Sequence, residues 1–302
     1  MRGRCAEENH ARPRKTRFLS HRLSSYDPRE KLTMPLITDQ DHLLTDQYRS
    51  AANLSARNSL HERFSVNQRG WHPWVFDQIA SLPAQSRILE LGCGPGWLWV
   101  HNRQRIPSGW EITLGDLSPG MIDQARRNLA QEGETRFRFE VIDAQAIPYP
   151  DAAFDAVVAN HMLYHVPDRP RALAEIRRVL KPGGWLYAAT NGRDHMAELW
   201  QIVLQVGDAA RDANRSELHF GLESGLEQLQ PWFTAIERRD YPDALLVTEA
   251  EPLIAYAASS ALWGVQGDEA ATERLAGHVR DQLAREGVIH ISKNSGLFVA
   301  RR

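Results

Sequence analysis

A glycine-rich turn after a short apolar strand is the part of this sequence with the clearest chemical potential. The chain reads Ile88-Leu89-Glu90-Leu91-Gly92-Cys93-Gly94-Pro95-Gly96, a strand that ends beside an acid and then glycines at every second position. Because these glycines carry no Cβ, the backbone of the turn can lie very close to a ligand. A dinucleotide-binding turn would need its third glycine where Trp97 stands, and Pro95 removes an N–H that a diphosphate would use. The turn is therefore predicted to bind a ligand other than a dinucleotide.

Alternating strand and helix patterns around this turn predict an α/β fold. Apolar runs predict strands at 86–91, 111–116, 137–142, 154–159 and 184–190, a bent strand across 234–248 and a last strand at 288–300. Periodicity predicts helices at about 118–132, 168–180, 194–213, 222–230, 250–260 and 268–286, preceded by two short helices within 41–66 and a third over 71–79. Such βα units form a doubly wound, mostly parallel sheet, here seven-stranded, with helices on both faces and an antiparallel strand added at the edge.

Two further acids follow the next strands. Asp116 ends the second strand in Leu114-Gly115-Asp116-Leu117-Ser118-Pro119-Gly120-Met121, 20 residues beyond Gly96, and Asp143-Ala144-Gln145 follows the third strand. Ligands of open α/β sheets bind at the carboxyl ends of the strands, so both acids are expected beside the glycine-rich turn. A carboxylate that accepts two hydrogen bonds suits a vicinal diol.

Together with Phe154 to His161 and Leu180 to Leu186, these motifs cover about residues 86 to 191. In order and spacing they resemble the class I S-adenosylmethionine-dependent methyltransferases, closest to the small-molecule group that includes ubiquinone-type and natural-product enzymes. The resemblance implies S-adenosylmethionine as cofactor, S-adenosylhomocysteine as product and no metal, with Asp116 on the ribose hydroxyls and Asp143 on the adenine amino group. The cofactor contacts it implies are Glu90, Gly92, Cys93, Gly94, Gly96, Trp97, Asp116, Leu117, Met121, Asp143, Ala144, Asn160 and Tyr48.

Two of these residues have a second interpretation. Glu90 is expected to contact the methionine portion of the cofactor or to order the glycine-rich loop, and the structural alternative is an ordinary capped strand end. Tyr48 either closes over the cofactor as a lid residue or packs a helix face on the domain.

His161 and His165 are the candidate catalytic residues, because they follow the fourth strand four residues apart, near where the methyl group is expected to point. A hydroxyl acceptor needs a base to take its proton, whereas an amine that is already neutral needs only positioning. For His161, proton transfer or substrate contact stands beside a purely structural role. For His165 a buried, hydrogen-bonded structural histidine is favoured.

Composition restricts the partners and divides the chain. The 302 residues carry a formal net charge of −2, and the two cysteines, Cys5 and Cys93, cannot form a disulfide framework. Residues 1–33 hold nine bases against four acids and are expected to be a disordered basic leader, with Met34 as the working start. Residues 34–82 are expected to form an N-terminal helical lid. Residues 83–302 are expected to form the methyltransferase domain, with a helical acceptor-site insert at about 194–232.

The function these observations predict is methyl transfer to an oxygen or nitrogen atom of a small molecule, by in-line displacement in an enclosed pocket of a cytoplasmic protein. Nucleic acid is disfavoured as a partner because the body beyond residue 33 has a net charge of −7. No apolar run is long enough for a membrane span. The alternatives are an RNA or protein methyltransferase and a non-catalytic S-adenosylmethionine-binding interaction protein, and the oligomeric state stays open.

Overall fold

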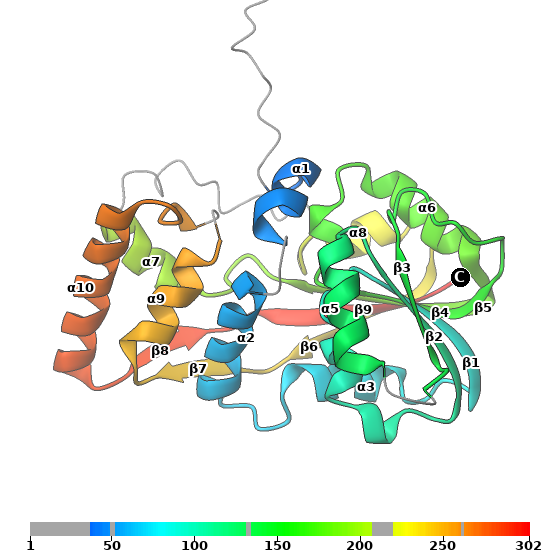
Figure 1. The fold of residues 1–302 in the computed structure, drawn as a ribbon, viewed down its shortest axis with the longest axis horizontal. Helices are drawn as coiled ribbons and strands as arrows, with labels where there is room; N and C mark the ends of the chain where they lie inside the picture. Colours follow the sequence, from blue (N-terminus) through cyan, green and yellow to red (C-terminus); the bar gives the residue numbers. More distant parts are fainter. Residues whose placement is uncertain (1–36, 49–51, 131–133, 207–219, 261–262) are drawn as a thin grey trace, which may run out of the picture. The chain divides into compact units, whose positions relative to one another are not determined.

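The computed structural model describes residues 37–48, 52–130, 134–206, 220–260 and 263–302 (Figure 1). All of them belong to one compact unit, Met34–Arg302. The expected basic leader, 1–33, and the expected start at Met34 lie outside the described residues. No described helix has the length and apolarity that crossing a membrane requires.

The core of this unit is a seven-stranded sheet with the order β3-β2-β1-β4-β5-β9-β6. Its strands are β1 Gln85–Leu91, β2 Gly109–Asp116, β3 Phe137–Val141, β4 Phe154–Asn160, β5 Leu180–Asn191, β6 Thr234–Tyr241 and β9 Ser295–Arg301. The first five strands pair in parallel, and β9 pairs antiparallel with both β5 and β6. The predicted doubly wound fold is confirmed, with one difference: the antiparallel β9 lies second from the edge, and β6 is outermost.

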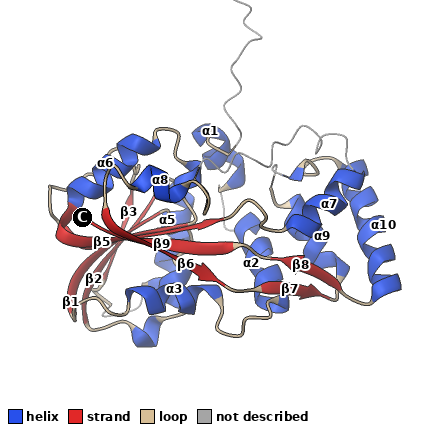
Figure 2. Cartoon of the chain, turned by 180° about the vertical axis from the view of Figure 1, so that it is seen from behind, coloured by secondary structure: helices blue, strands red, loops and turns tan. Residues whose placement is uncertain are grey.

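Helices cover both faces of the sheet. They are α3 Trp71–Ile79, α4 Trp97–Val100, α5 Pro119–Leu129, α6 Arg169–Val179 and α8 Gly225–Leu229. In Figures 1 and 2, α6 and α8 lie on the face opposite α3. Asp168 and Ser118 cap the N-termini of α6 and α5 with their side chains, and each helix has a proline in its first turn, as expected for helix starts.

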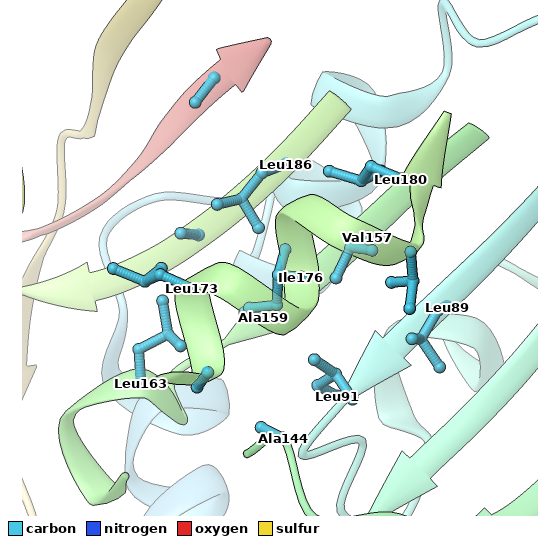
Figure 3. Packing of buried hydrophobic residues seen from close by; sticks show 14 of the residues in the cluster. Leu89, Leu91, Ala144, Val157, Ala159, Leu163, Leu173, Ile176, Leu180 and Leu186 are labelled. Atoms are coloured by element: carbon cyan, nitrogen blue, oxygen red, sulfur yellow. The ribbon is translucent and has the colours of Figure 1, made fainter. Parts of the chain in front are cut away.

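Alternation along the strands divides the core into two layers. In β1, Leu89 and Leu91 face α6, whereas Ile88 faces α3 and α5. Figure 3 shows the α6 layer, where Leu173 and Ile176 pack over the sheet. Because both faces of β1 are buried in its second half, Ile88–Leu91 are apolar apart from Glu90. The sheet is thereby a rigid base for the loops at its carboxyl edge.

A helical lobe adjoins the β6–β9 end of the sheet. It consists of α2 Ala52–Phe64, α7 Ala197–Val206, α9 Ala250–Ala258, α10 Glu269–Glu286 and the hairpin of β7 Ala244–Val247 with β8 Ile289–Ser292. The hairpin continues β6 and β9 along the chain, so the predicted bent strand and the predicted last strand are each broken in two. Before α2 come a single turn, α1 Gln40–His42, and a π-helical turn, Leu43–Gln47.

The described parts of the expected acceptor-site insert at 194–232 pack in two places, and residues 207–219 between them lie outside the described residues. Its first part, α7, packs in the core of the lobe with α9 and α10. Its last part, α8, packs instead against the sheet, where Leu229 joins the α6 layer of the core. The physical reason is that α7 presents Leu199, Ile202 and Val203 to apolar faces supplied by residues 250–286, which the sequence pattern did not assign to the lobe.

Candidate functional site

The glycine-rich turn joins β1 to α4 and requires glycine at each of its three positions. Gly92, Gly94 and Gly96 have φ angles of 65°, 53° and 76°, a left-handed conformation that other residues adopt at a cost. A Cβ at Gly92 would lie 2.5 Å from the Cβ of Met162, which follows β4. A Cβ at Gly94 would lie 3.3 Å from Leu54 of α2. The turn therefore packs between the segment that follows β4 and the helix α2 of the lobe.

Asp116 links this turn to the next loop. Its Oδ2 accepts the backbone N–H of Gly94 at 2.9 Å, and its Oδ1 accepts that of Ser118 at 2.8 Å. Burial raises the pKa of this carboxyl, and the two backbone donors act in the opposite direction. Each oxygen retains a further lone pair, so the carboxyl can still accept from the hydroxyls of a ligand.

The loops after β2 and β3 hold the other predicted contacts beside the turn. Asp143 accepts the backbone N–H of Gln145 at 2.8 Å, which closes a tight turn of its own. Ala144 is buried in the α6 layer, and Met121 is buried at the start of α5. Since the order β3-β2-β1-β4 places these strand ends side by side, the structure brings the predicted residues together at one edge. Their contacts with a cofactor stay predictions.

Glu90 points away from this edge and into the core. Its Oε2 accepts the indole N–H of Trp99 in α4 at 2.6 Å, and the residue is 1% exposed. Burial raises the pKa of Glu90 to about 8 against the Trp99 hydrogen bond, and the charge of Asp116 raises it further. Of the two roles open from the sequence, this geometry supports ordering of the loop.

Cys93 and Trp97 belong to the same turn but differ in environment. The Cys93 thiol is buried, and burial raises its pKa well above the ordinary value, so it is held as the thiol. Trp97 begins α4 and is half-buried, with its ring 6.2 Å from that of His72.

Tyr48 fastens the N-terminal segment over the site. Its hydroxyl donates to Nε2 of His165 at 2.9 Å, and its carbonyl accepts from the Ser118 hydroxyl at 2.9 Å. His165 donates its Nδ1 hydrogen to the carbonyl of Ile37 at 2.7 Å. Both ring nitrogens of His165 are therefore occupied, which assigns this histidine to positioning the segment from Ile37 to Tyr48.

His161 is different because one of its ring nitrogens is buried without a partner. Its Nδ1 forms no hydrogen bond, and its ring lies 4.8 Å from that of Trp71. Its backbone has φ of 58°, left-handed and strained for a histidine, and is held by a hydrogen bond to the carbonyl of Ala189 at 3.1 Å. Burial lowers the pKa of His161 to about 3, with a further contribution from Lys293. At neutral pH the imidazole is uncharged. The neighbouring Asn160 accepts the indole N–H of Trp71 at 3.2 Å.

Four basic residues that the sequence did not single out form a group with His161. Arg57, His195, Lys293 and His161 all act electrostatically on the fourth of them, His61. We call these four and His161 the basic chamber. They come from α2, from the loop before α7, from the segment between β8 and β9, and from the exit of β4. No local motif joins positions so far apart. The only signal in the sequence is the spacing of Leu54, Arg57 and His61, which places them along one helix face.

Comparison with known proteins identifies the central part of the chain. Residues 89–188 match the family described as a methyltransferase domain. Malonyl-[acyl-carrier protein] O-methyltransferase of Enterobacter lignolyticus is 34% identical over 157 residues, which are 51% of this chain and 59% of that protein. Demethylmenaquinone methyltransferase of Thermus thermophilus is 42% identical over 108 residues, 36% of this chain and 48% of that protein. The chain thus spans about half the length of the curated relatives it matches.

A solved structure shares the fold. Phosphoethanolamine N-methyltransferase 2 of Haemonchus contortus, determined with S-adenosyl-L-methionine, aligns over 89% of this chain and 60% of that chain, with a TM-score of 0.57 and 18% identity.

Proposed function

We propose that the chain, whose residues 89–188 match a methyltransferase domain, is a class I S-adenosylmethionine-dependent methyltransferase that transfers the methyl group of its cofactor to a small molecule. The observation that carries the proposal is the junction at Gly94. There Asp116 holds the backbone of the turn from one side, and Leu54 of α2 lies over it from the other. A cofactor-binding turn covered in this way forms part of an enclosed site.

The groups present fit S-adenosylmethionine. The turn offers backbone without side chains, and each oxygen of Asp116 can accept a ribose hydroxyl beside its backbone donor. Asp143 follows the neighbouring strand β3, and the family resemblance implies that it accepts from the adenine amino group. When bound, the cofactor supplies a sulfonium methyl group for in-line displacement by the acceptor atom. The residues of the chain contribute by orienting the acceptor and excluding water.

Closure of the site favours a small molecule over RNA or protein. The Tyr48 hydrogen bonds to His165 and to Ser118 hold the N-terminal segment against the loops after β2 and β4. The helix α2 follows and contacts both the glycine-rich turn and the other elements of the lobe. A macromolecular acceptor would have to displace this cover, which favours a small molecule as the acceptor.

We propose an oxygen or nitrogen atom as the acceptor, with His161 as the residue that takes a proton from a hydroxyl. Its uncharged imidazole has an unpartnered Nδ1, the form in which a base can act. His165 is assigned no such step, because both of its nitrogens are hydrogen-bonded.

The first test is calorimetric titration of the full chain with S-adenosylhomocysteine. Saturable binding is expected, weakened about 10- to 100-fold in Asp116→Asn, because two hydrogen bonds to a charged carboxylate are replaced by weaker ones. Asp123→Asn is the matched control, since this residue is exposed on α5 and pairs with Arg126. Equal affinity of the Asp116 variant, or binding of NADH in place of S-adenosylhomocysteine, would refute the cofactor assignment.

The acceptor class is tested by turnover. The enzyme is incubated with S-adenosylmethionine and either a cell extract fraction of low molecular mass or a fraction of RNA and protein, and S-adenosylhomocysteine release is measured. Release with the first fraction alone is the expected result. Release only with the second would contradict the small-molecule proposal.

A further inference from the structure

The basic chamber contains buried polar atoms that have no hydrogen-bond partner in the described part of the chain. They are Nε and Nη2 of Arg57, Nδ1 of His61 and Nδ1 of His161. Folded proteins leave few such atoms, and those that persist at a site call for a ligand or water to satisfy them. Around them lie aromatic rings: the Arg57 guanidinium is 5.5 Å from the ring of Tyr48, and the ring of His61 is 5.5 Å from that of Tyr256.

The members of the chamber interact electrostatically. Burial lowers the pKa of His61 well below its ordinary value, and the basic groups of Lys293, His195, His161 and Arg57 lower it further. Burial and Lys293 also lower the pKa of His195 to about 3. The histidines are therefore uncharged at neutral pH, and the positive charge of the chamber comes from Arg57 and Lys293.

These two cations differ in their partners. Lys293 forms a buried ion pair with Asp243 at 2.5 Å. Among the residues that the structure describes, none forms a hydrogen bond with Nε or Nη2 of Arg57. Burying the N–H donors of a charged group without an acceptor costs free energy. These two N–H groups are therefore the atoms of the chamber that would gain most from a ligand.

The ligand that would satisfy these two N–H groups is an oxyanion. The Nε and Nη2 hydrogens lie on one edge of the planar guanidinium and point the same way, which matches two oxygens of a carboxylate or a phosphate. A metal ion is not the expected occupant. Among the residues that the structure describes, no group of three His, Cys, Asp or Glu side chains is placed to hold one.

We propose that the acceptor carries an oxyanion, a carboxylate or a phosphate, which binds the Nε–Nη2 edge of Arg57 with His61 as a further donor. The inference rests on the proposed function and adds the class of acceptor to it. The position on α2 supports it: Leu54 lies over Gly94, Arg57 follows one turn later, and His61 one turn beyond that. The unpartnered atoms therefore extend from the cofactor turn toward the lobe. His161, at the exit of β4, borders the same space.

S-adenosylmethionine has a carboxylate of its own, so the experiment must separate the two sources. The full chain, saturated with S-adenosylhomocysteine, is titrated with acetate, with inorganic phosphate and with acetamide, which has the shape of acetate without its charge. The readout is the Nε–H resonance of Arg57 in a nitrogen–proton correlation spectrum, assigned by its loss in Arg57→Gln. Arg63, exposed on the same helix and paired with Glu249, provides the control resonance.

The expected result is a saturable shift of the Arg57 resonance with acetate or phosphate, none with acetamide, and no saturable shift at Arg63. Whichever anion binds more tightly identifies the group on the acceptor. Arg57→Lys, which keeps the charge but loses the fork, should weaken the anion about 10-fold or more, and the affinity for S-adenosylhomocysteine should stay the same.

Three results overturn the inference. If the Arg57 resonance does not move, or moves equally with acetamide, the chamber does not select an oxyanion. If Arg57→Lys or Arg57→Gln loses S-adenosylhomocysteine while remaining folded, Arg57 holds the carboxylate of the cofactor. A wild-type protein that fails to bind S-adenosylhomocysteine at all refutes the proposed function itself, which is a separate outcome.

Discussion

Replacing Glu90 with glutamine should stabilise the folded protein at pH 8 and change it little at pH 5. The Glu90 carboxyl is 1% exposed and accepts one hydrogen bond, from the indole of Trp99. Burial raises its pKa to about 8, from 4.5 in the unfolded chain. The folded state therefore keeps a proton that the unfolded state releases, and folding is opposed increasingly as the pH rises from 4.5 to 8.

The size of the effect follows from the shift. Each pKa unit corresponds to about 1.4 kcal/mol, so the ionisable carboxyl costs under about 1 kcal/mol of stability at pH 5 and about 4 kcal/mol at pH 8. Glutamine keeps an oxygen that accepts from Trp99 and has no proton to lose. The difference in unfolding free energy between Glu90→Gln and the wild type should therefore grow by about 3 kcal/mol between these two pH values.

The assay is guanidinium unfolding of both proteins, free of cofactor, at pH 5 and pH 8, followed by circular dichroism. Buried histidines such as His161 change stability in the opposite sense, since their lowered pKa values cost stability as the pH falls, but they are common to both proteins and cancel in the difference. Glu111→Gln, exposed on β2, is the matched control. A difference between Glu90→Gln and the wild type that is equal at both pH values would refute the argument that the buried carboxyl is protonated.

Three further outcomes are expected. Gly92→Ala should lower the free energy of unfolding by about 2 to 4 kcal/mol in chemical denaturation, because the new Cβ meets Met162 and the backbone is left-handed; an unchanged stability would contradict the close packing. Tyr48→Phe should weaken S-adenosylhomocysteine about 5-fold in calorimetry through loss of the hydrogen bond to His165, and unchanged affinity would mean that the segment does not cover the cofactor. His161→Asn, which tolerates the left-handed backbone, should reduce kcat for a hydroxyl acceptor by about 100-fold or more while S-adenosylhomocysteine still binds, and full activity would exclude His161 as the base.

The sheet could be predicted from the sequence because local and global signals agree there. The run from Ile88 to Leu91 is apolar on both faces, and the glycines after it allow only a turn. The predicted third helix over 71–79 coincides with α3, and most other boundaries differ by a few residues. The lobe could not be assembled in the same way. Its core joins Leu60 of α2 with residues from 196 to 291, contacts that depend on packing rather than on local periodicity.

The part of the site that is built from the glycine-rich turn and the strand ends could be predicted from the sequence. The part that is built from side chains distant in the sequence could not. Asp116 could be placed from its strand and its spacing to Gly96. The inward turn of Glu90 could not, because its partner Trp99 lies on a short helix whose orientation is set by packing against α3. Arg57 and Lys293 are 236 positions apart in the chain, and nothing near either marks it as part of one chamber.

The basic chamber departs from two features of stable proteins, paired buried polar atoms and an unstrained backbone. Each buried donor or acceptor without a partner costs about 1 to 3 kcal/mol, and a left-handed histidine adds about 1 to 3 kcal/mol. In this chain both kinds of cost meet at the carboxyl edge of the sheet, in Arg57, His61 and His161, although the layers beneath are closely packed and apolar. Sequences selected for stability alone would replace such groups with apolar ones of similar size. Their concentration beside the glycine-rich turn fits the proposed role in recognising the acceptor, whose binding would offset the cost.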